Sequence, residues 1–188
     1  MTQLTQPDQK TLLSIARDAL ESSVRREKLP EIKISDLSQT LIAEGASFVT
    51  LTKDGFLRGC IGTLEAYQPL AKDVQGHAVA AALQDPRFPP VQPLECPLIE
   101  IEVSVLTPKV PLDYEDDLDL INKIKPGIDG VVLQNDFRKA TFLPQVWEKL
   151  PTHEDFLTHL CLKMGARGNL WREKPLKVFL YQVQEFHE

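Results

Sequence analysis

The sequence predicts a protein of the α/β (α+β) class, with helices packed beside antiparallel strand pairs. Apolar residues recur at helical spacing across residues 8–28, and apolar and polar residues alternate strictly across residues 98–107. Two further regions, residues 48–64 and 131–143, each contain two strand-like runs separated by a short turn signal. Short turns join antiparallel strands, so these observations together predict helices combined with antiparallel sheet.

Two helices are predicted in the first half of the chain, over residues 8–28 and 69–83. In the first, Leu12, Ala16 and Leu20 recur at helical spacing with charged residues between them, and a proline lies just past its end. The second carries a narrow stripe of small apolar residues, a pattern suited to close packing on a sheet.

The region between these helices is the most informative part of the sequence. Phe48–Thr52 is rich in β-branched and aromatic residues. Asp54-Gly55 is a strong hairpin signal, and it precedes a returning strand over residues 56–64. The returning strand places a cation, a thiol and two glycines within seven residues.

Strict alternation gives the returning strand one face that carries Phe56, Arg58, Cys60 and Gly62. Arg58 and Cys60 then project the same way, about 6.5 Å apart along the strand. Glycine costs backbone entropy in a strand and packs no side chain. Because Gly59 and Gly62 flank the cysteine, we expect another backbone or a ligand to approach closely there.

Residues 85–90 follow the second helix and include prolines that exclude regular structure. Two interpretations remain open for Asp85 and Arg87. They line one concave site with Arg58 and Cys60, or they form a local ion pair where the helix stops.

Residues 98–107 predict a half-buried strand with Glu100 and Glu102 on its polar face. Glu102 lies at the middle of the strand, which makes it the better candidate for an acid–base group or a buried partner of Arg58 or Arg87.

The rest of the chain predicts an acidic loop and helix start at 113–119, a second hairpin turning at 134–136, a helix over 152–164 and a final strand over 176–183.

Composition narrows the class of protein. At 188 residues and a net charge of -6, the chain fits one domain or two small lobes, and its acidity disfavours a nonspecific nucleic-acid or membrane surface. We find no signal peptide and no apolar run of about 20 residues that would span a bilayer. Cys60, Cys96 and Cys161 are too far apart for a disulfide framework, which favours a reducing cytoplasm, and alone they cannot hold an iron–sulfur cluster.

Cys60 is the leading candidate for chemistry. A thiol is nucleophilic as its thiolate, which a cation such as Arg58 favours, and amides near Gly59 and Gly62 could hold an oxyanion. The alternative is that Cys60 is a small core residue, since the sequence marks no catalytic histidine. His77 is a second candidate, as a general base or a core-edge residue. Histidine spacing elsewhere does not predict a metal site.

The last third of the chain is more basic than the rest and contains Phe137 and Trp171. This pattern fits a nucleic-acid footprint or, as we favour, a solvated charged surface.

The block Phe48-Val-Thr-Leu with Leu57-Arg-Gly-Cys-Ile-Gly-Thr-Leu-Glu65 resembles the hallmark of the AMMECR family. The family is named after the human chromosomal region for Alport syndrome, midface hypoplasia, intellectual disability and elliptocytosis. Other matching segments run through nearly the whole chain: Asp85-Pro-Arg-Phe88, Ile101–Pro108, Pro126–Val132 and Ala140–Glu148.

The resemblance implies a compact fold in which helices flank a mixed, largely antiparallel sheet. Residues 1–188 would form a single AMMECR domain of two lobes, with the Arg-Gly-Cys strand near the cleft between them. In prokaryotes such proteins resemble one part of a three-part AmmeMemoRadiSam system, whose other parts are a radical-SAM protein and a Memo-type protein similar to ring-opening dioxygenases. The positions on the family motifs are Arg58, Gly59, Cys60, Gly62, Asp85, Arg87 and Glu102.

We therefore expect a cytoplasmic protein that binds a small molecule or modified group, either as an enzyme or as a carrier. It would have neither a resident cofactor nor a metal, and no membrane contact. A non-catalytic interaction module and, more weakly, RNA binding remain open. The expected catalytic residues are Cys60, Arg58 and Glu102, and the expected ligand-binding residues are Gly59, Gly62, Asp85 and Arg87.

Overall fold

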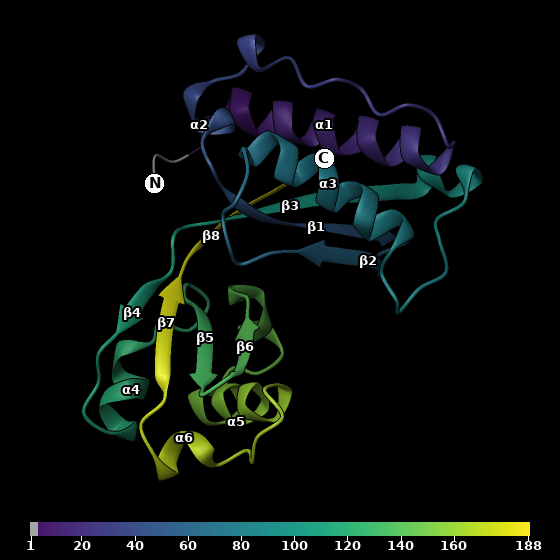
Figure 1. Ribbon diagram of the computed structural model, residues 1–188. Helices are drawn as coiled ribbons and strands as arrows, with labels where there is room; N and C mark the ends of the chain where they lie inside the picture. The colour runs from purple at the N-terminus through teal and green to yellow at the C-terminus, as the bar shows by residue number, and fades with distance from the viewer. Residues whose placement is uncertain (1–3) are drawn as a thin grey trace. The chain divides into compact units, whose positions relative to one another are not determined.

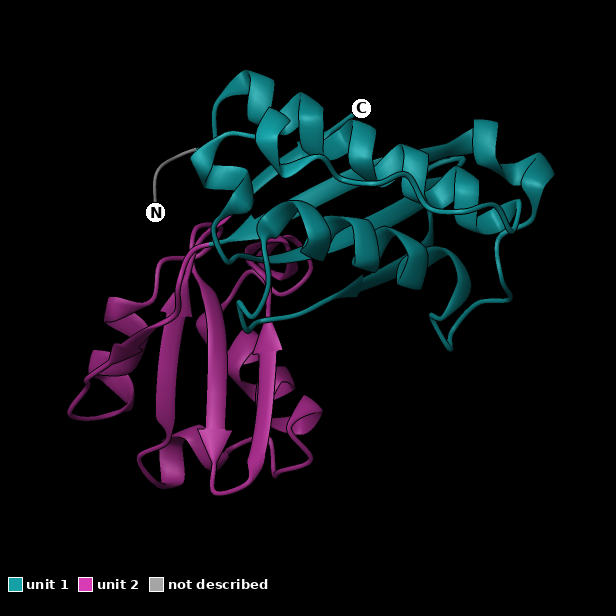
Figure 2. Cartoon of the chain, turned by 45° about the horizontal axis from the view of Figure 1, so that its top comes forward, with its two compact units in different colours: residues 1–106, 184–188 teal, residues 107–183 magenta. Residues whose placement is uncertain are grey.

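Two units make up the chain, and each is built on its own four-stranded antiparallel sheet (Figures 1 and 2). The computed structural model describes residues 4–188. Unit 1 comprises Met1–Leu106 and Gln184–Glu188, and unit 2 comprises Thr107–Val183. The predicted combination of helices with antiparallel sheet is confirmed, although the strands form two sheets where the family resemblance implied one. Within the described residues, no helix has the length and apolarity needed to cross a membrane.

In unit 1, helices α1 and α3 cover one face of a sheet with strand order β2-β1-β3-β8 (Figure 1). Ala16 of α1 and Ala81 of α3 are buried in one core cluster with Val49 and Ile101 of the sheet. The elements are α1 (Gln6–Val24), η1 (Ile34–Asp36), α2 (Gln39–Ile42), β1 (Ala46–Lys53), β2 (Phe56–Gly62), α3 (Leu70–Leu83), η2 (Pro93–Leu98), β3 (Ile99–Leu106) and β8 (Val183–His187).

Helix α1 confirms the prediction for residues 8–28, with bounds that its capping residues set. Thr5 and Asp8 form a reciprocal capping box, so the helix begins at Gln6. It ends at Val24, and Arg26 adopts a left-handed backbone conformation with φ of 60° shortly after.

The β1–β2 hairpin turns through Asp54-Gly55 as predicted, and both residues have positive φ, 53° and 78°. The predicted strict alternation along β2 is wrong. The register shifts in this strand pair, and Arg58 is the extra residue of a β-bulge with no partner in β1. Phe56 therefore lies on the helix-covered face, while Cys60 and Gly62 share the opposite face.

In unit 2, the sheet has strand order β4-β7-β5-β6. Trp147 stacks on Phe156 at a centroid distance of 3.7 Å within its core. Helix α5 confirms the prediction for residues 152–164, because Thr152 caps its first turn. The elements are β4 (Val110–Leu112), α4 (Asp117–Lys123), β5 (Gly130–Asn135), β6 (Arg138–Phe142), η3 (Pro144–Glu148), α5 (His153–Lys163), α6 (Leu170–Glu173) and β7 (Lys177–Tyr181).

Two predictions about this half of the chain are wrong in detail. The second hairpin turns at Asp136-Phe137 and not at 134–136, because Asp136 takes the positive φ of 53° that the turn needs. The predicted single strand over 176–183 is interrupted at Gln182, whose main chain bonds to Thr107. The chain then continues as β8, which joins the sheet of unit 1.

Candidate functional site

Three side chains form a row across the face of the unit 1 sheet that α1 and α3 leave uncovered. Cys60 of β2 lies directly opposite Thr50 of β1, and Thr50 lies opposite Glu102 of β3. The Thr50 hydroxyl donates a hydrogen bond to the Cys60 Sγ over 3.3 Å. Cys60 and Glu102 are both half-buried. Their Cα atoms are two interstrand spacings apart, about 10 Å.

Asp85 and Arg87 hold the main chain of Cys60 at the edge of the sheet. Asp85 Oδ2 accepts the Cys60 N–H over 2.9 Å, and Arg87 Nη2 donates to the Cys60 carbonyl over 3.1 Å. Arg87 also donates to both carboxylate oxygens of Asp85 over 2.9 and 2.7 Å. These hydrogen bonds from Arg87 outweigh burial and hold the Asp85 pKa far below its usual range. The outward backbone groups of Cys60 are thereby satisfied, and strand pairing at this edge is blocked.

Arg58 is engaged by a carboxylate, Glu95 of η2. Its Nε and Nη2 donate to the two oxygens of Glu95 over 3.1 and 3.0 Å, and its Nη1 donates to the Pro89 carbonyl over 2.9 Å. Lys53 Nζ contacts the same carboxylate at 3.2 Å. The Arg58 hydrogen bonds lower the Glu95 pKa to about 2 despite partial burial. Arg58 thus ties the hairpin to η2, and its charge is already paired.

The two motif glycines allow close packing within the protein. A Cβ atom on Gly59 would lie 2.2 Å from the carbonyl oxygen of Ala81 in α3. On Gly62 it would lie 2.3 Å from the ring of Phe48 and 2.4 Å from the carbonyl oxygen of Ser47. Both positions therefore meet other parts of the chain, and the expectation of a close approach applies to the protein's own atoms.

The other two thiols are less accessible than Cys60. Cys96 and Cys161 are buried, with 1% and 0% of their surface exposed. Burial raises the pKa of both thiols. The carboxylate that adds to this effect at Cys96 is Glu21. Cys60 alone among the three cysteines retains substantial exposed surface.

The structure brings most of the predicted site residues together. Cys60, Asp85 and Arg87 form one hydrogen-bonded group. Arg58 bonds to the same loop through the Pro89 carbonyl, and Glu102 belongs to the row across Thr50. The glycines contribute packing beside this group.

Sequence reasoning missed Thr50 and Glu95. The register set by the Asp54-Gly55 turn would put Gly59 opposite Thr50, and only the bulge at Arg58 brings Cys60 there, so the two strands carried no signal for this pairing. Glu95 lies in an irregular, proline-rich segment between α3 and β3, where neither periodicity nor motif indicates a partner for Arg58.

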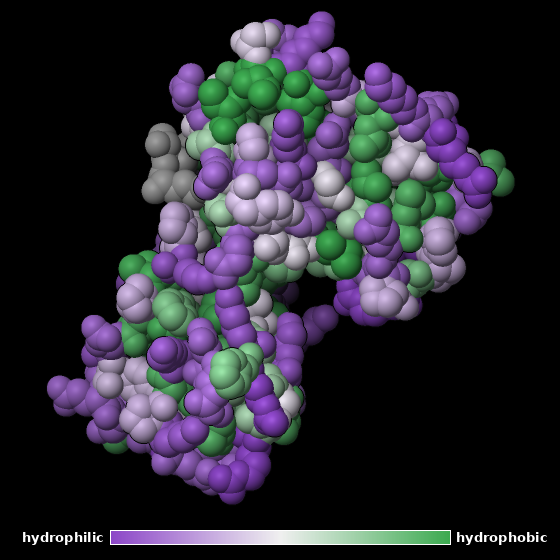
Figure 3. Space-filling view, in the orientation of Figure 1, coloured by the Kyte–Doolittle hydropathy of each residue, from purple (hydrophilic) through white to green (hydrophobic). Residues whose placement is uncertain are grey.

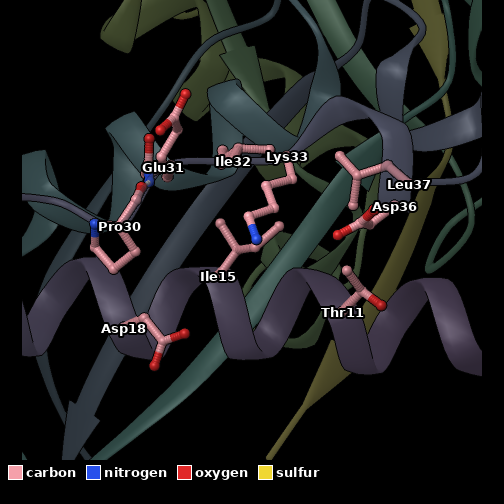
Figure 4. A pocket seen from close by; sticks show the side chains of 10 residues that line it. Thr11, Ile15, Asp18, Pro30, Glu31, Ile32, Lys33, Asp36 and Leu37 are labelled. Carbon is pink, nitrogen blue, oxygen red and sulfur yellow. Dashed lines mark hydrogen bonds between the residues drawn. The ribbon is translucent and has the colours of Figure 1, made fainter.

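A pocket in unit 1 lies apart from these residues (Figure 4). It has a volume of about 230 Å³ and lies between α1 and the segment over residues 30–37. Ile15 of α1 and Ile32 and Leu37 of the facing segment supply its apolar lining. Hydrophobic side chains gather over this part of unit 1 (Figure 3). None of the seven predicted site residues lines this pocket.

Comparison with known proteins identifies the family. The AMMECR1 family model matches residues 13–186. A protein of Methanothermobacter thermautotrophicus is 38% identical over 193 residues, covering 98% of this chain and 96% of its own. A protein of Thermofilum pendens is 37% identical, covering 100% of this chain and 93% of its own. The crystal structure of the uncharacterized protein PH0010 from Pyrococcus horikoshii matches with a TM-score of 0.88 and 32% identity, covering 96% of this chain and 91% of that one. The chain belongs to the AMMECR1 family.

Proposed function

We propose that the sheet face around Cys60 binds a small molecule or modified group, and that Cys60 is its nucleophile or attachment point. The row of Cys60, Thr50 and Glu102 carries this proposal. It combines a half-buried thiol on β2, a hydroxyl on β1 that donates to the sulfur and a carboxylate on β3. The hydrogen bond from Thr50 also fixes the position of the sulfur on the sheet face.

The other residues take supporting roles in this proposal. Thr50 contacts the Cys60 sulfur, the role first expected for Arg58, whose guanidinium is paired with Glu95. Glu102 acts as acid or base on the bound group. Asp85 and Arg87 fix the main chain of Cys60, so that its side chain keeps one position on the sheet face.

The proposal extends to location and partners. Family membership supports a cytoplasmic protein that acts beside a radical-SAM protein and a Memo-type protein. In this scheme the group held at Cys60 passes between this chain and one of those partners. We expect the wild-type chain to capture one of these two partners in a binding experiment. The Cys60→Ser variant should lose this binding.

One observation favours a second candidate, a non-catalytic interaction module. Large apolar side chains are exposed where the hairpin meets η2: Phe56 is 78% exposed, Leu94 is 90% exposed and Leu98 is 54% exposed. The Arg58–Glu95 pair fixes the hairpin beside η2, so these side chains belong to one region. Exposed apolar groups that lie together mark protein interaction surfaces.

Native mass spectrometry of freshly purified protein separates the two candidates. We expect a bound mass on the wild-type chain that is lost in Cys60→Ser and retained in Leu94→Ser, the matched variant of the apolar region. Retention of the same mass in Cys60→Ser would remove Cys60 as the attachment point. A chain without bound mass whose protein association is lost in Leu94→Ser would support the interaction module.

A further inference from the structure

A buried polar cluster lies on the opposite side of the unit 1 sheet from Cys60. Asp73 and His77 are one turn apart on α3, and Ser47 belongs to β1. Ser47 and Asp73 are completely buried, and His77 is 8% exposed. The row at Cys60 does not use this cluster, so its chemistry stands independently of the function proposed above.

The Asp73 carboxylate is surrounded by hydrogen-bond donors. Its Oδ2 accepts from the Ser47 N–H over 2.9 Å and from the Ser47 hydroxyl over 2.7 Å. Its Oδ1 accepts from the Gln68 side-chain amide over 3.2 Å. All three contacts bring a donor to the carboxylate, so Asp73 is an acceptor toward its neighbours.

These hydrogen bonds fix which nitrogen of His77 carries the proton. His77 Nδ1 lies 3.4 Å from the Ser47 hydroxyl oxygen and 3.2 Å from Asp73 Oδ2. The Ser47 hydroxyl proton is already directed to Asp73, so both neighbours present lone pairs to Nδ1. An unprotonated Nδ1 would face lone pairs on both sides. The neutral ring is therefore held as the Nδ1–H tautomer, and its Nε2 carries the free lone pair.

The Nε2 atom is left available for a further partner. No described residue is bonded to Nε2. This nitrogen is also not one of the fully buried side-chain atoms that lack a hydrogen-bond partner. About a tenth of the His77 side-chain surface, 11%, remains exposed. A histidine oriented by a buried carboxylate, with its second nitrogen accessible, has the arrangement of an acid–base group.

We propose that His77 is the hydrogen-bond acceptor of a second site, which takes a ligand presenting a hydroxyl or amide N–H. The ligand O–H or N–H donates its hydrogen bond to the Nε2 lone pair. The Asp73 carboxylate, 3.2 Å from Nδ1, holds the ring in the orientation that presents this lone pair. A purely structural cluster would pin β1 to α3 equally well, and it would need neither this tautomer nor access to Nε2.

The tautomer is read directly by long-range ¹H–¹⁵N correlation spectra of the full-length, histidine-labelled protein above the imidazole pKa, at about pH 8.5. Two other histidines are internal controls. His159 Nδ1 lies 2.9 Å from the Asp155 carbonyl and must carry a proton there, whereas His153 Nε2 lies 3.0 Å from the Ile124 carbonyl. We expect the His77 signal to match the His159 pattern. A His77 signal with the Nε2–H pattern of His153 would overturn the proposal.

Two further measurements separate a ligand-binding histidine from a structural one. In Asp73→Asn the amide can donate to Nδ1, and we expect loss of the Nδ1–H majority; an unchanged tautomer in the folded variant contradicts the proposal. On the wild-type chain, diethyl pyrocarbonate should modify His77 faster than His153, whose Nε2 is engaged. Modification of His77 no faster than His153 would overturn the proposal, even if Asp73→Asn fails to fold. Prior alkylation of Cys60 should leave the His77 rate unchanged.

Discussion

At Cys60, side chains from a distant loop occupy the main-chain groups that an edge strand presents outward. Asp85 accepts the Cys60 N–H and Arg87 donates to its carbonyl, while Arg58 is held by Glu95 of η2. These three charged residues of the motifs therefore act on the protein's own structure. Cys60 and Glu102 are the residues proposed to meet a ligand.

The Arg58–Glu95 pair is expected to contribute measurably to stability. Replacing a carboxylate that accepts charged hydrogen bonds leaves Arg58 without its partner, which costs about 1.5–3 kcal/mol. Glu95→Gln should lower the free energy of unfolding in urea by that amount. Glu100→Gln, at an exposed position of β3, is the matched control and should change it by less than about 0.5 kcal/mol. Equal effects of the two substitutions on the free energy of unfolding would show that the Arg58–Glu95 pair does not stabilise the fold.

At the scale of elements, β2 lies close to α3 because Gly59 has no side chain. Gly59→Ala brings a Cβ to 2.2 Å from the Ala81 carbonyl oxygen, so either the strand or the helix must move. Overpacking of this kind costs about 1–3 kcal/mol, and we expect a corresponding loss in chemical denaturation.

Gly76 provides the control for that prediction. It lies within α3 and its Cβ would meet no atom within 4 Å. Because alanine is the better helix former, Gly76→Ala should stabilise the protein by about 0.5–1 kcal/mol. A Gly59→Ala variant as stable as Gly76→Ala would contradict the packing role of the motif glycine.

Elements decided by local chemistry were predictable from the sequence. The turn at Asp54-Gly55 and the start of α5 at Thr152 follow from positive φ and helix capping. The pairing of Arg58 with Glu95 was not, because the two residues lie in segments distant in the sequence, and no local signal marks the bulge at Arg58. For the same reason the final strand was not divided at Gln182 between two sheets. The grouping of Cys60 with Asp85 and Arg87 was predictable from the sequence, but the contacts made by Thr50 and Glu95 were not.

For the whole molecule, the depressed carboxyl pKa values predict how stability depends on acidity. Arg58 lowers the pKa of Glu95 to about 2 from its ordinary value of 4.5, so the contribution of this pair to stability is complete above about pH 4.5 and is lost as the pH falls toward 2. Arg87 lowers the pKa of Asp85, which adds to the loss of stability below its ordinary value of 3.8. Wild type and Glu95→Gln should therefore converge in melting temperature between pH 5 and pH 2.5. Parallel curves would contradict the assignment.

The reactivity of Cys60 is the most direct test of the proposed site. Limited iodoacetamide labelling of the native chain near neutral pH, read by peptide mass spectrometry, ranks the three thiols in one experiment. We expect Cys60 to react first, because Cys96 and Cys161 are buried and burial raises their pKa. We also expect Thr50→Val to slow the reaction, since it removes the hydrogen bond to the sulfur. Labelling of Cys96 or Cys161 before Cys60 would contradict the account and leave the motif a structural one.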